Sequence, residues 1–335
     1  MANEILSSLL KEYEQKRTEK EQELEKRREE IYKKIPRLAQ IEEELSNSAI
    51  TMAKELLKSN KTAAKEFNQN VEKLKKEKEE ILKKENIDSS YLKLQYECKD
   101  CKDTGYISNK DYSSTMCHCL KQRLLNKWYN KANISNLDKE NFNTFNLSVF
   151  SDKVNEKYNI SPRKNIENIK DKAIEFIKEF DNPEYKNLLF TGNIGLGKTF
   201  MANCIAHELL QKGKTVLYQT SPVLLETIID IKMSRNKTKE QSEFYKNVLE
   251  CDLLIIDDLG TESLNSMLLS ELFTILNTRI LNLNSKVTKT IISTNLNIEE
   301  IFKNYEERIG SRIAGFYDIY HFFGEDLRMK KKSIE

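Results

Sequence analysis

A glycine-rich segment in the second half of the chain has residues that could hold a phosphate chain. It reads GNIGLGKT, fits the pattern G-x-x-x-x-G-K-[ST], and lies between an apolar run and the helical run MANCIAHELL. Glycines let the backbone wrap phosphate with its amides pointing inward, and the following helix adds partial positive charge. The lysine would reach the β and γ phosphates, and the threonine hydroxyl would bind Mg²⁺. The residues that this motif assigns to ATP or ADP are Gly192, Asn193, Gly195, Gly197, Lys198 and Thr199.

Two adjacent acids lie in a second apolar run, LLIIDDLG, which spans residues 253–260. Open parallel sheets bind ligands at the carboxyl ends of their strands, so Asp257 would support Mg²⁺ and Asp258 would polarise the attacking water. Taken alone, the same pair could instead cap the next helix. Asn295 ends the run IISTN and could orient that water, although asparagine at a strand end is often a turn residue. The sequence therefore predicts a site for ATP hydrolysis.

Four closely spaced cysteines form a candidate metal site. Cys98 and Cys101 are followed by Cys117 and Cys119, giving the spacing C-x₂-C-x₁₅-C-x-C. Four thiolates can close a tetrahedral structural Zn²⁺ site, and zinc would supply the stability that a segment of about thirty residues lacks. The second pair is tighter than usual, so His118 could replace one thiolate. Free thiols or a redox pair are the alternatives.

The elements that must position the phosphate motif and the acids alternate along the second half of the chain. Short apolar runs rich in β-branched residues alternate with helical patterns, which is typical of a parallel sheet in an α/β fold. The predicted strands are 187–191, 215–219, 253–257, 290–294 and 319–323.

The first 104 residues contain no glycine and one proline, and most of them favour helices. Apolar residues recur every seven positions from Leu24 to Met52 and again from Phe67 to Ile81. We expect two helical arms that fold back at the polar break 58–61 into a coiled hairpin. The apolar stripe is then either an internal core or a surface for a partner.

The charge balance identifies no partner. The 335 residues include 55 basic and 53 acidic ones, with a net charge of +2, so DNA contact would require a local basic patch. Arg279 and the closing run Lys330 to Lys332 are the candidates. No basic segment followed by an apolar stretch opens the chain, and no run approaches about 18 apolar residues, so we expect no membrane contact and a cytoplasmic location.

The runs GNIGLGKT, LLIIDDLG and IISTN, in this order and spacing, resemble the AAA+ ATPases of the DnaC/DnaI replicative helicase loader group. FNTFNLSVFSDKV is similar to the segment that precedes the ATPase core in that group. The resemblance covers Cys98 to Arg328 and leaves the helical first ninety residues uncovered. It implies a sheet ordered 5-1-4-3-2, self-association through the ATPase domains, and a role in placing the replicative ring helicase on single-stranded DNA.

The resemblance also implies roles for three arginines. Arg312 matches the finger that enters a neighbouring subunit's site, with Arg308 as the runner-up, and Arg328 resembles the sensor-2 arginine. A full C-terminal lid is not expected. Asp258 stands where many AAA+ enzymes have the longer glutamate, which predicts slow hydrolysis stimulated by a partner or by single-stranded DNA, with nucleotide serving mainly as an assembly switch.

The predicted organisation has four parts. These are a helicase-binding helical hairpin (1–90), a zinc module (91–121), a connector (122–165) and the AAA+ domain (166–335). Two other functions remain open: a transposase-helper ATPase resembling IstB, against which the cysteine module argues, and a nucleotide-gated adaptor with negligible hydrolysis.

Overall fold

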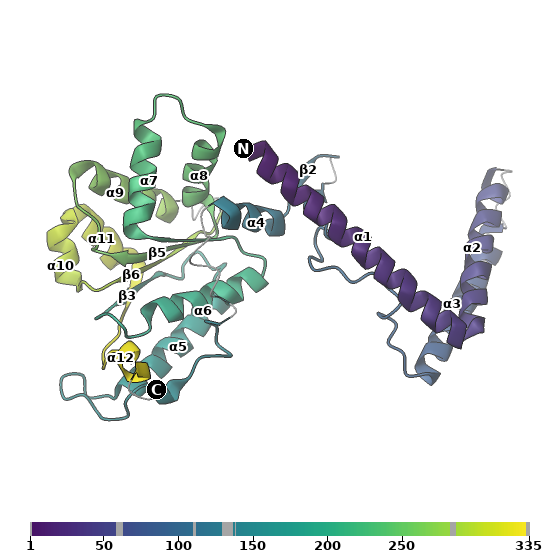
Figure 1. The fold of residues 1–335 in the computed structure, drawn as a ribbon, viewed down its shortest axis with the longest axis horizontal. Helices are drawn as coiled ribbons and strands as arrows, with labels where there is room; N and C mark the ends of the chain where they lie inside the picture. The colour runs from purple at the N-terminus through teal and green to yellow at the C-terminus, as the bar shows by residue number, and fades with distance from the viewer. Residues whose placement is uncertain are drawn as a thin grey trace. The chain divides into compact units, whose positions relative to one another are not determined.

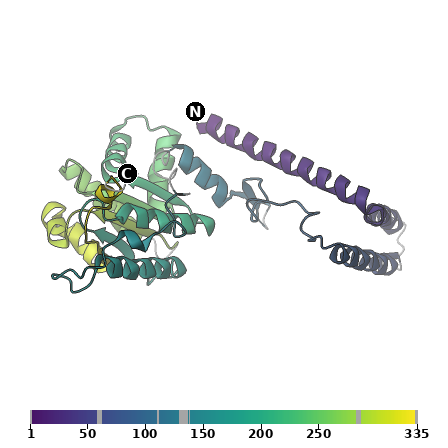
Figure 2. The ribbon, with the colours of Figure 1, turned by 60° about the horizontal axis from the view of Figure 1, so that its bottom comes forward.

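The computed structural model describes residues 2–57, 63–109, 112–128, 137, 139–281 and 286–332. They group into two compact units, one of residues 7–117 and one of residues 1–6 with 118–335. Figures 1 and 2 show the elements of each unit. Within the described ranges, no helix is long and apolar enough to cross a membrane.

A proline divides the N-terminal helical region. α1 (Ala2–Lys34) ends just before it, α2 (Pro36–Leu57) begins on it, and α3 (Ala63–Lys84) follows. Proline inside a helix removes a backbone hydrogen bond and clashes with the preceding turn, whereas the first helical position tolerates it. The prediction of two arms, with one heptad stripe running from Leu24 to Met52, is therefore wrong: the region contains three helices.

α2 and α3 pack against each other as a hairpin. The Arg37 guanidinium donates to both carboxylate oxygens of Glu77, at 2.7 and 3.0 Å, and the Asn70 amide donates to the Ser48 hydroxyl at 3.3 Å. These pairs run in opposite directions along the two helices, so the helices are antiparallel. The predicted turn at 58–61 lies outside the described residues.

A short antiparallel ribbon follows the helices. β1 (Tyr106–Ser108) pairs with β2 (Ser114–Met116), with Tyr106 opposite Met116. Each strand has only three residues, and a two-stranded ribbon of this size has little core of its own. The segment therefore depends on something besides apolar burial for its stability.

Five parallel strands form the sheet of the second unit. Their order is β4-β5-β6-β3-β7, which in chain order is the predicted arrangement 5-1-4-3-2. The strands are β3 (Asn187–Thr191), β4 (Val216–Thr220), β5 (Leu253–Leu259), β6 (Lys289–Thr294) and β7 (Tyr317–His321). The α/β fold class is confirmed, and the predicted strand bounds are correct for β3 and displaced by one or two residues at one or both ends of the others.

Helices cover both faces of this sheet (Figure 1). Because strand side chains alternate, Leu188 and Phe190 pack with α5 and α6, whereas Leu189 packs on the opposite side with α7, α9 and α11. The helices and the 3-10 turn of this unit are α4 (His118–Trp128), η2 (Leu147–Val149), α5 (Pro162–Lys178), α6 (Lys198–Gln211), α7 (Ser221–Met233), α8 (Lys239–Glu250), α9 (Ser266–Leu281), α10 (Ile298–Asn304), α11 (Glu306–Phe316) and α12 (Leu327–Lys332).

One side chain caps the first residue of β4 at the outer edge of the sheet. The Gln122 amide, on α4, donates to the Val216 carbonyl at 3.0 Å and accepts from the Val216 N–H at 2.8 Å. This pair of bonds imitates the bonding of a neighbouring strand. Gln122 is buried, so the contact fixes α4 against β4.

Arg279 is buried inside the domain and does not lie on its surface. It is 1% exposed, and its guanidinium donates to the carbonyls of Val248 at 2.9 Å and Lys289 at 2.6 Å and to the Thr290 hydroxyl at 2.9 Å. These bonds tie α9 to β6 and to the end of α8. The prediction that Arg279 contacts DNA is therefore wrong, because a buried guanidinium with its donors occupied cannot reach a phosphate.

Candidate nucleotide and metal sites

The phosphate motif forms the turn between β3 and α6. Gly192, Gly195 and Gly197 have φ angles of 129°, 79° and 91°, which side chains rarely adopt. A Cβ atom on Gly192 would lie 2.1 Å from the Phe322 carbonyl oxygen, and one on Gly195 would lie 1.9 Å from an Asp326 carboxylate oxygen. Backbone conformation therefore favours glycine at all three positions, and the close approach of the C-terminal segment adds a second reason at Gly192 and Gly195.

The Lys198 ammonium is held at the centre of this turn. It donates to the carbonyls of Gly192 at 2.5 Å and Asn193 at 2.7 Å, and to the Asn295 side-chain oxygen at 2.9 Å. Burial lowers the pKa of Lys198, although the carboxylates of Asp258 and Asp257 oppose this shift. Asn295 thus lies beside the lysine that the motif assigns to the phosphates, as its predicted place requires.

Asp257 lies in β5, two residues before the strand ends at Leu259, and is 4% exposed. The Thr199 hydroxyl donates to its Oδ2 at 3.1 Å, which brings together the two residues predicted to support Mg²⁺. The hydroxyls of Tyr218 and Ser293 also donate to this carboxylate, through Oδ2 and Oδ1 respectively. Hydroxyl and carboxylate oxygens are the ligands that Mg²⁺ prefers, so this donor set fits the ion.

Asp258 adopts an unusual backbone conformation. Its φ is 55°, and the pairing of β5 with β6 shifts register between Ile256 and Leu259. Bulges and left-handed residues often occur where a fold aims a functional side chain. The Asp258 N–H donates to the Ser293 hydroxyl at 3.1 Å, and burial, together with the Asp257 carboxylate, raises the pKa of Asp258.

The C-terminal segment is tied to the phosphate turn. The Leu327 N–H donates to the Gly195 carbonyl at 3.0 Å, and the Asp326 carboxylate accepts from the Arg328 N–H at 2.8 Å. Arg328 itself is exposed, and its charge is close enough to contribute to lowering the pKa of Lys198, after the larger effect of burial. Arg328 therefore follows a segment bonded to the phosphate turn of its own subunit, and its sensor-2 role stays a prediction.

Arg312 and Arg308 lie on α11 but differ in their contacts. The Arg308 guanidinium donates to Glu306 at 2.8 Å and lies 4.8 Å from the centre of the Phe273 ring. Arg312 lies 5.9 Å from the centre of the Phe316 ring on its own helix. Within the described residues Arg312 has no ion pair or hydrogen bond, so it has more freedom to reach a neighbouring molecule, and the structure does not join it to Lys198 or Asp258.

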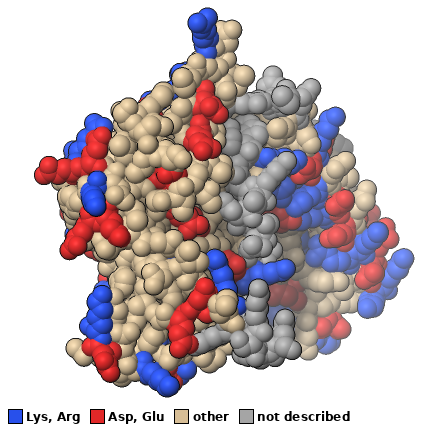
Figure 3. Space-filling model, turned by 60° about the vertical axis from the view of Figure 1, so that its left-hand side comes forward, with Lys and Arg blue, Asp and Glu red and all other residues tan. Residues whose placement is uncertain are grey.

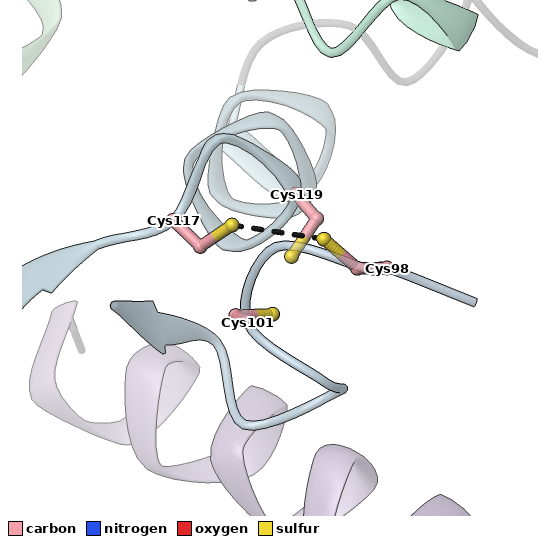
Figure 4. Close-up of side chains that lie close together, drawn as sticks. All are labelled: Cys98, Cys101, Cys117 and Cys119. Carbon is pink, nitrogen blue, oxygen red and sulfur yellow. Dashed lines mark hydrogen bonds between the residues drawn. The ribbon is translucent and has the colours of Figure 1, made fainter. Parts of the chain in front are cut away.

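The four cysteines of the predicted zinc site come together (Figure 4). Their sulfur atoms all lie within 4.8 Å of one another, and those of Cys98 and Cys117 are 3.7 Å apart. Zinc bound to four thiolates at about 2.3 Å separates neighbouring sulfurs by about 3.8 Å, so the cluster has the right size. Cys98, Asp100 and His118 form an overlapping group of possible ligands, but only the four thiols complete a tetrahedral set by themselves.

A buried acid supports the first cysteine pair. The Asp103 carboxylate accepts from the N–H groups of Glu97 at 2.9 Å and Cys98 at 2.8 Å, and from the Lys20 ammonium at 3.2 Å. Burial alone would raise the pKa of Asp103, but these donors outweigh it and hold the pKa below its usual value. The Gly105 N–H donates to the Cys101 sulfur at 3.4 Å, a bond that favours a thiolate.

Zinc content provides a direct test of this cluster. The purified chain is expected to hold about one zinc ion, and Cys101→Ser to lose it, because three thiolates bind the ion far less well than four. Elemental analysis after dialysis against metal-free buffer measures both. Cys204→Ala is the matched control, since Cys204 is buried and lies outside the cluster, and it should keep the ion. Zinc-free wild type would rule the site out.

Sequence reasoning found most of the phosphate site but missed part of its support. The structure joins Lys198 to Asn295 and Thr199 to Asp257 by hydrogen bonds, and their roles toward nucleotide stay predictions. The missed residues of the phosphate site are Tyr218 and Ser293, and Asp103 was missed at the cysteine cluster. Ser293 belongs to the run IISTN, and its place two residues before Asn295 was the available signal. In the sequence, Tyr218 has no feature that distinguishes it from other strand residues.

The described surface shows no dominant basic patch on the face drawn in Figure 3, where basic and acidic side chains are interspersed. The side chains of Lys330 to Lys332 lie outside the described residues. DNA binding by this chain therefore stays a prediction.

Comparison with known proteins identifies relatives of the ATPase region. Residues 164–316 match the family model described as the bacterial DnaA ATPase domain. The replicative helicase loader DnaC of Escherichia coli K12 is 31% identical over 157 residues, which cover 46% of this chain and 60% of DnaC. The chromosomal replication initiator DnaA of Helicobacter hepaticus is 32% identical over 132 residues, covering 38% of this chain and 26% of DnaA.

Two solved structures align with part of the chain. The crystal structure of the DnaC helicase loader has 24% identity and a TM-score of 0.43, covering 53% of this chain and 96% of that one. The crystal structure of DnaI has 22% identity and a TM-score of 0.43, and the match covers 56% of this chain and 94% of that one. The sequence matches confirm the predicted resemblance for the ATPase region, which is homologous to DnaC and forms a DnaA-type AAA+ domain. Such a domain supports nucleotide-binding ATPase activity.

Proposed function

We propose that this chain is an ATP-dependent loader that delivers a replicative ring helicase onto single-stranded DNA. The observation that carries the proposal is that Lys198 bonds to Asn295 and Thr199 bonds to Asp257 near the carboxyl ends of the strands, in a domain homologous to DnaC. The relative's name gives the helicase as its cargo, and we extend that role to this chain. The cytoplasm is the location that this role implies.

The nucleotide in this proposal is ATP, with ADP as the product. The amides of the glycine-rich turn bind the phosphates, and Lys198 exchanges its neutral carbonyl acceptors for phosphate oxygens of higher charge. Thr199 and Asp257 hold Mg²⁺, which would neutralise charge on the transferring phosphoryl group. Asp258 polarises the attacking water, and Asn295 orients it.

Hydrolysis by the isolated chain is expected to be slow. Aspartate is one methylene shorter than the glutamate that many AAA+ enzymes carry at position 258, so it reaches the water less well. Nucleotide then serves mainly as an assembly switch, and a partner or single-stranded DNA stimulates turnover. Fast turnover by the isolated protein would contradict this part of the proposal.

Self-association is proposed to complete the site. Arg312 would enter the ATP site of a neighbouring copy and stabilise charge on the phosphoryl group during transfer. Arg328 would act within its own subunit, where the Leu327 bond to Gly195 keeps it near the phosphate turn. One subunit alone would therefore bind ATP but hydrolyse it poorly.

The remaining parts of the chain are assigned to partner binding. The helical region 1–90 would grip the helicase, and the zinc module 91–121 would hold this region in shape. The connector 122–165 would lead into the ATPase domain 166–335. This division is supported by the change in composition along the chain and by the hairpin of α2 and α3.

Co-purification with the replicative helicase of the same organism tests the proposal. With ATP present, wild type is expected to form a stable complex, and a variant lacking residues 1–90 to lose it while still binding ATP. Retained ATP binding shows that the shortened chain is folded, so a lost complex can be assigned to the missing helices.

Two other results would redirect the assignment. No complex with any nucleotide would reject the loader and favour the transposase-helper function resembling IstB. A complex that forms with undetectable ATP turnover, with or without single-stranded DNA, would favour a nucleotide-gated adaptor.

A further inference from the structure

Tyr218 is a buried tyrosine whose hydroxyl meets the acid of the proposed magnesium site. It lies on β4, is 3% exposed, and donates its O–H to Asp257 Oδ2. The same oxygen accepts from the Thr199 hydroxyl at 3.1 Å. The roles proposed above for the nucleotide site give Tyr218 no part, although it contacts one of the two residues assigned to Mg²⁺.

The Asp257 carboxylate is constrained on both of its oxygens. Ser293 and the Asp258 N–H donate to Oδ1, the latter at 3.2 Å, and Tyr218 donates to Oδ2. Donors on both sides restrict rotation of the carboxyl group about its last bond. They leave Oδ2 turned toward Thr199, which is the direction of the phosphate turn.

The register of the sheet explains why a tyrosine can do this. Tyr218 pairs with Ile255, two residues before Asp257, and two strand residues span about 6.6 Å. A phenol is long enough to carry a donor over that distance along the neighbouring strand. Phenylalanine would fill the same space among the apolar residues that pack against α6 but would bring no donor.

We infer that Tyr218 is a positioning residue for Mg²⁺, acting through Asp257; this inference rests on the proposed nucleotide site. The hydroxyl fixes the carboxylate in the orientation that a magnesium ion shared with Thr199 requires. Groups that orient metal-binding carboxylates in this way commonly change metal affinity by 10- to 100-fold when removed. A tyrosine phenol is protonated at neutral pH, so it can act as the donor to this carboxylate.

If Tyr218 had a purely structural role, the loss of its hydroxyl would have a different effect. A buried phenol needs an acceptor, and Asp257 could simply be the nearest one. In that case, loss of the hydroxyl would lower the stability of the protein and leave its use of magnesium unchanged.

The test compares nucleotide affinity with and without magnesium. Fluorescently labelled ATP is titrated with full-length wild type and Tyr218→Phe, once in excess Mg²⁺ and once in EDTA. The affinity ratio between the two conditions is expected to fall about tenfold or more in the variant, while the affinity in EDTA stays at the wild-type value. This readout measures binding and does not depend on turnover.

Tyr305→Phe is the matched control. Tyr305 is fully buried and donates its hydroxyl to a carboxylate, that of Glu262, so the same atom and the same type of bond are lost. The two variants should show similar losses in melting temperature, but the magnesium ratio of Tyr305→Phe should match wild type. Equal magnesium ratios in the two variants would overturn the inference.

A double variant shows whether Tyr218 acts through Asp257. Adding Tyr218→Phe to Asp257→Asn should produce no further fall in the magnesium ratio, because the group being positioned is already gone. A further fall equal to that in the wild-type background would overturn the inference. Wild type that does not bind ATP in either condition would overturn the proposed nucleotide site and the inference with it, whereas a magnesium-dependent wild type with an unaffected Tyr218→Phe would overturn the inference alone.

Discussion

Lys198→Ala is expected to weaken ATP binding by about thirtyfold to several thousandfold. Truncating one partner of a buried, hydrogen-bonded charge pair costs about 2 to 5 kcal/mol, and each 1.4 kcal/mol is tenfold in affinity. Lys198 is 6% exposed, and its ammonium lies at the centre of the phosphate turn, so solvent cannot replace it. Titration of fluorescently labelled ATP into wild type and variant measures the effect.

Lys289→Ala separates this effect from the loss of any buried lysine. The Lys289 ammonium is also buried and also donates to two carbonyls, those of Asn182 and Tyr185, but at the opposite end of the sheet's strands. Its removal should lower stability and leave ATP affinity near wild type. Undiminished ATP binding by Lys198→Ala would reject the phosphate site, whatever the control does.

Arg312→Ala is expected to lower ATP turnover of the assembled protein by about a thousandfold or more, with ATP affinity little changed. A finger arginine stabilises charge that develops only during phosphoryl transfer, and its effect is worth about 10³ to 10⁵ in rate. Steady-state turnover at saturating ATP, with single-stranded DNA and helicase present, gives the rate. Arg312→Lys should recover little of it, because an ammonium lacks the planar fork of a guanidinium.

Two comparisons make the finger assignment specific. Arg308→Ala should have a much smaller effect, since Arg308 is already engaged by Glu306 and the Phe273 ring. Mixing Arg312→Ala with Lys198→Ala should restore part of the turnover, because a Lys198→Ala subunit supplies its intact arginine to a neighbour with an intact ATP site. Equal losses in the two arginine variants, or no recovery on mixing, would count against an arginine acting between subunits.

The chemical centre was predictable because its residues lie in short continuous patterns. A phosphate turn and a pair of acids each need a strand before them, and that context is visible in the sequence. The carboxyl ends of parallel strands lie at the same end of the sheet, so the sequence placed Lys198, Asp257 and Asn295 on one side of the domain. The strand order itself followed from the resemblance, since periodicity does not determine which strands are neighbours.

Features that depend on contacts between residues far apart in the sequence were harder to predict. The helix break at Pro36 was not predicted, because the seven-residue spacing of apolar residues continues from α1 into α2. Arg279 was taken for a surface residue, since only the packed structure reveals the carbonyls that surround it. The role inferred for Tyr218 depends on the register of β4 on β5, which residue spacing in the sequence does not reveal.

The side chain that caps the first residue of β4 has a consequence for association. Exposed sheet edges are templates on which a strand of a second molecule can add, and proteins commonly block them. Gln122 occupies both the N–H and the carbonyl of Val216, so the first residue of this edge strand cannot pair with another chain. The amide of a single glutamine thus disfavours edge-to-edge aggregation on this side of the sheet.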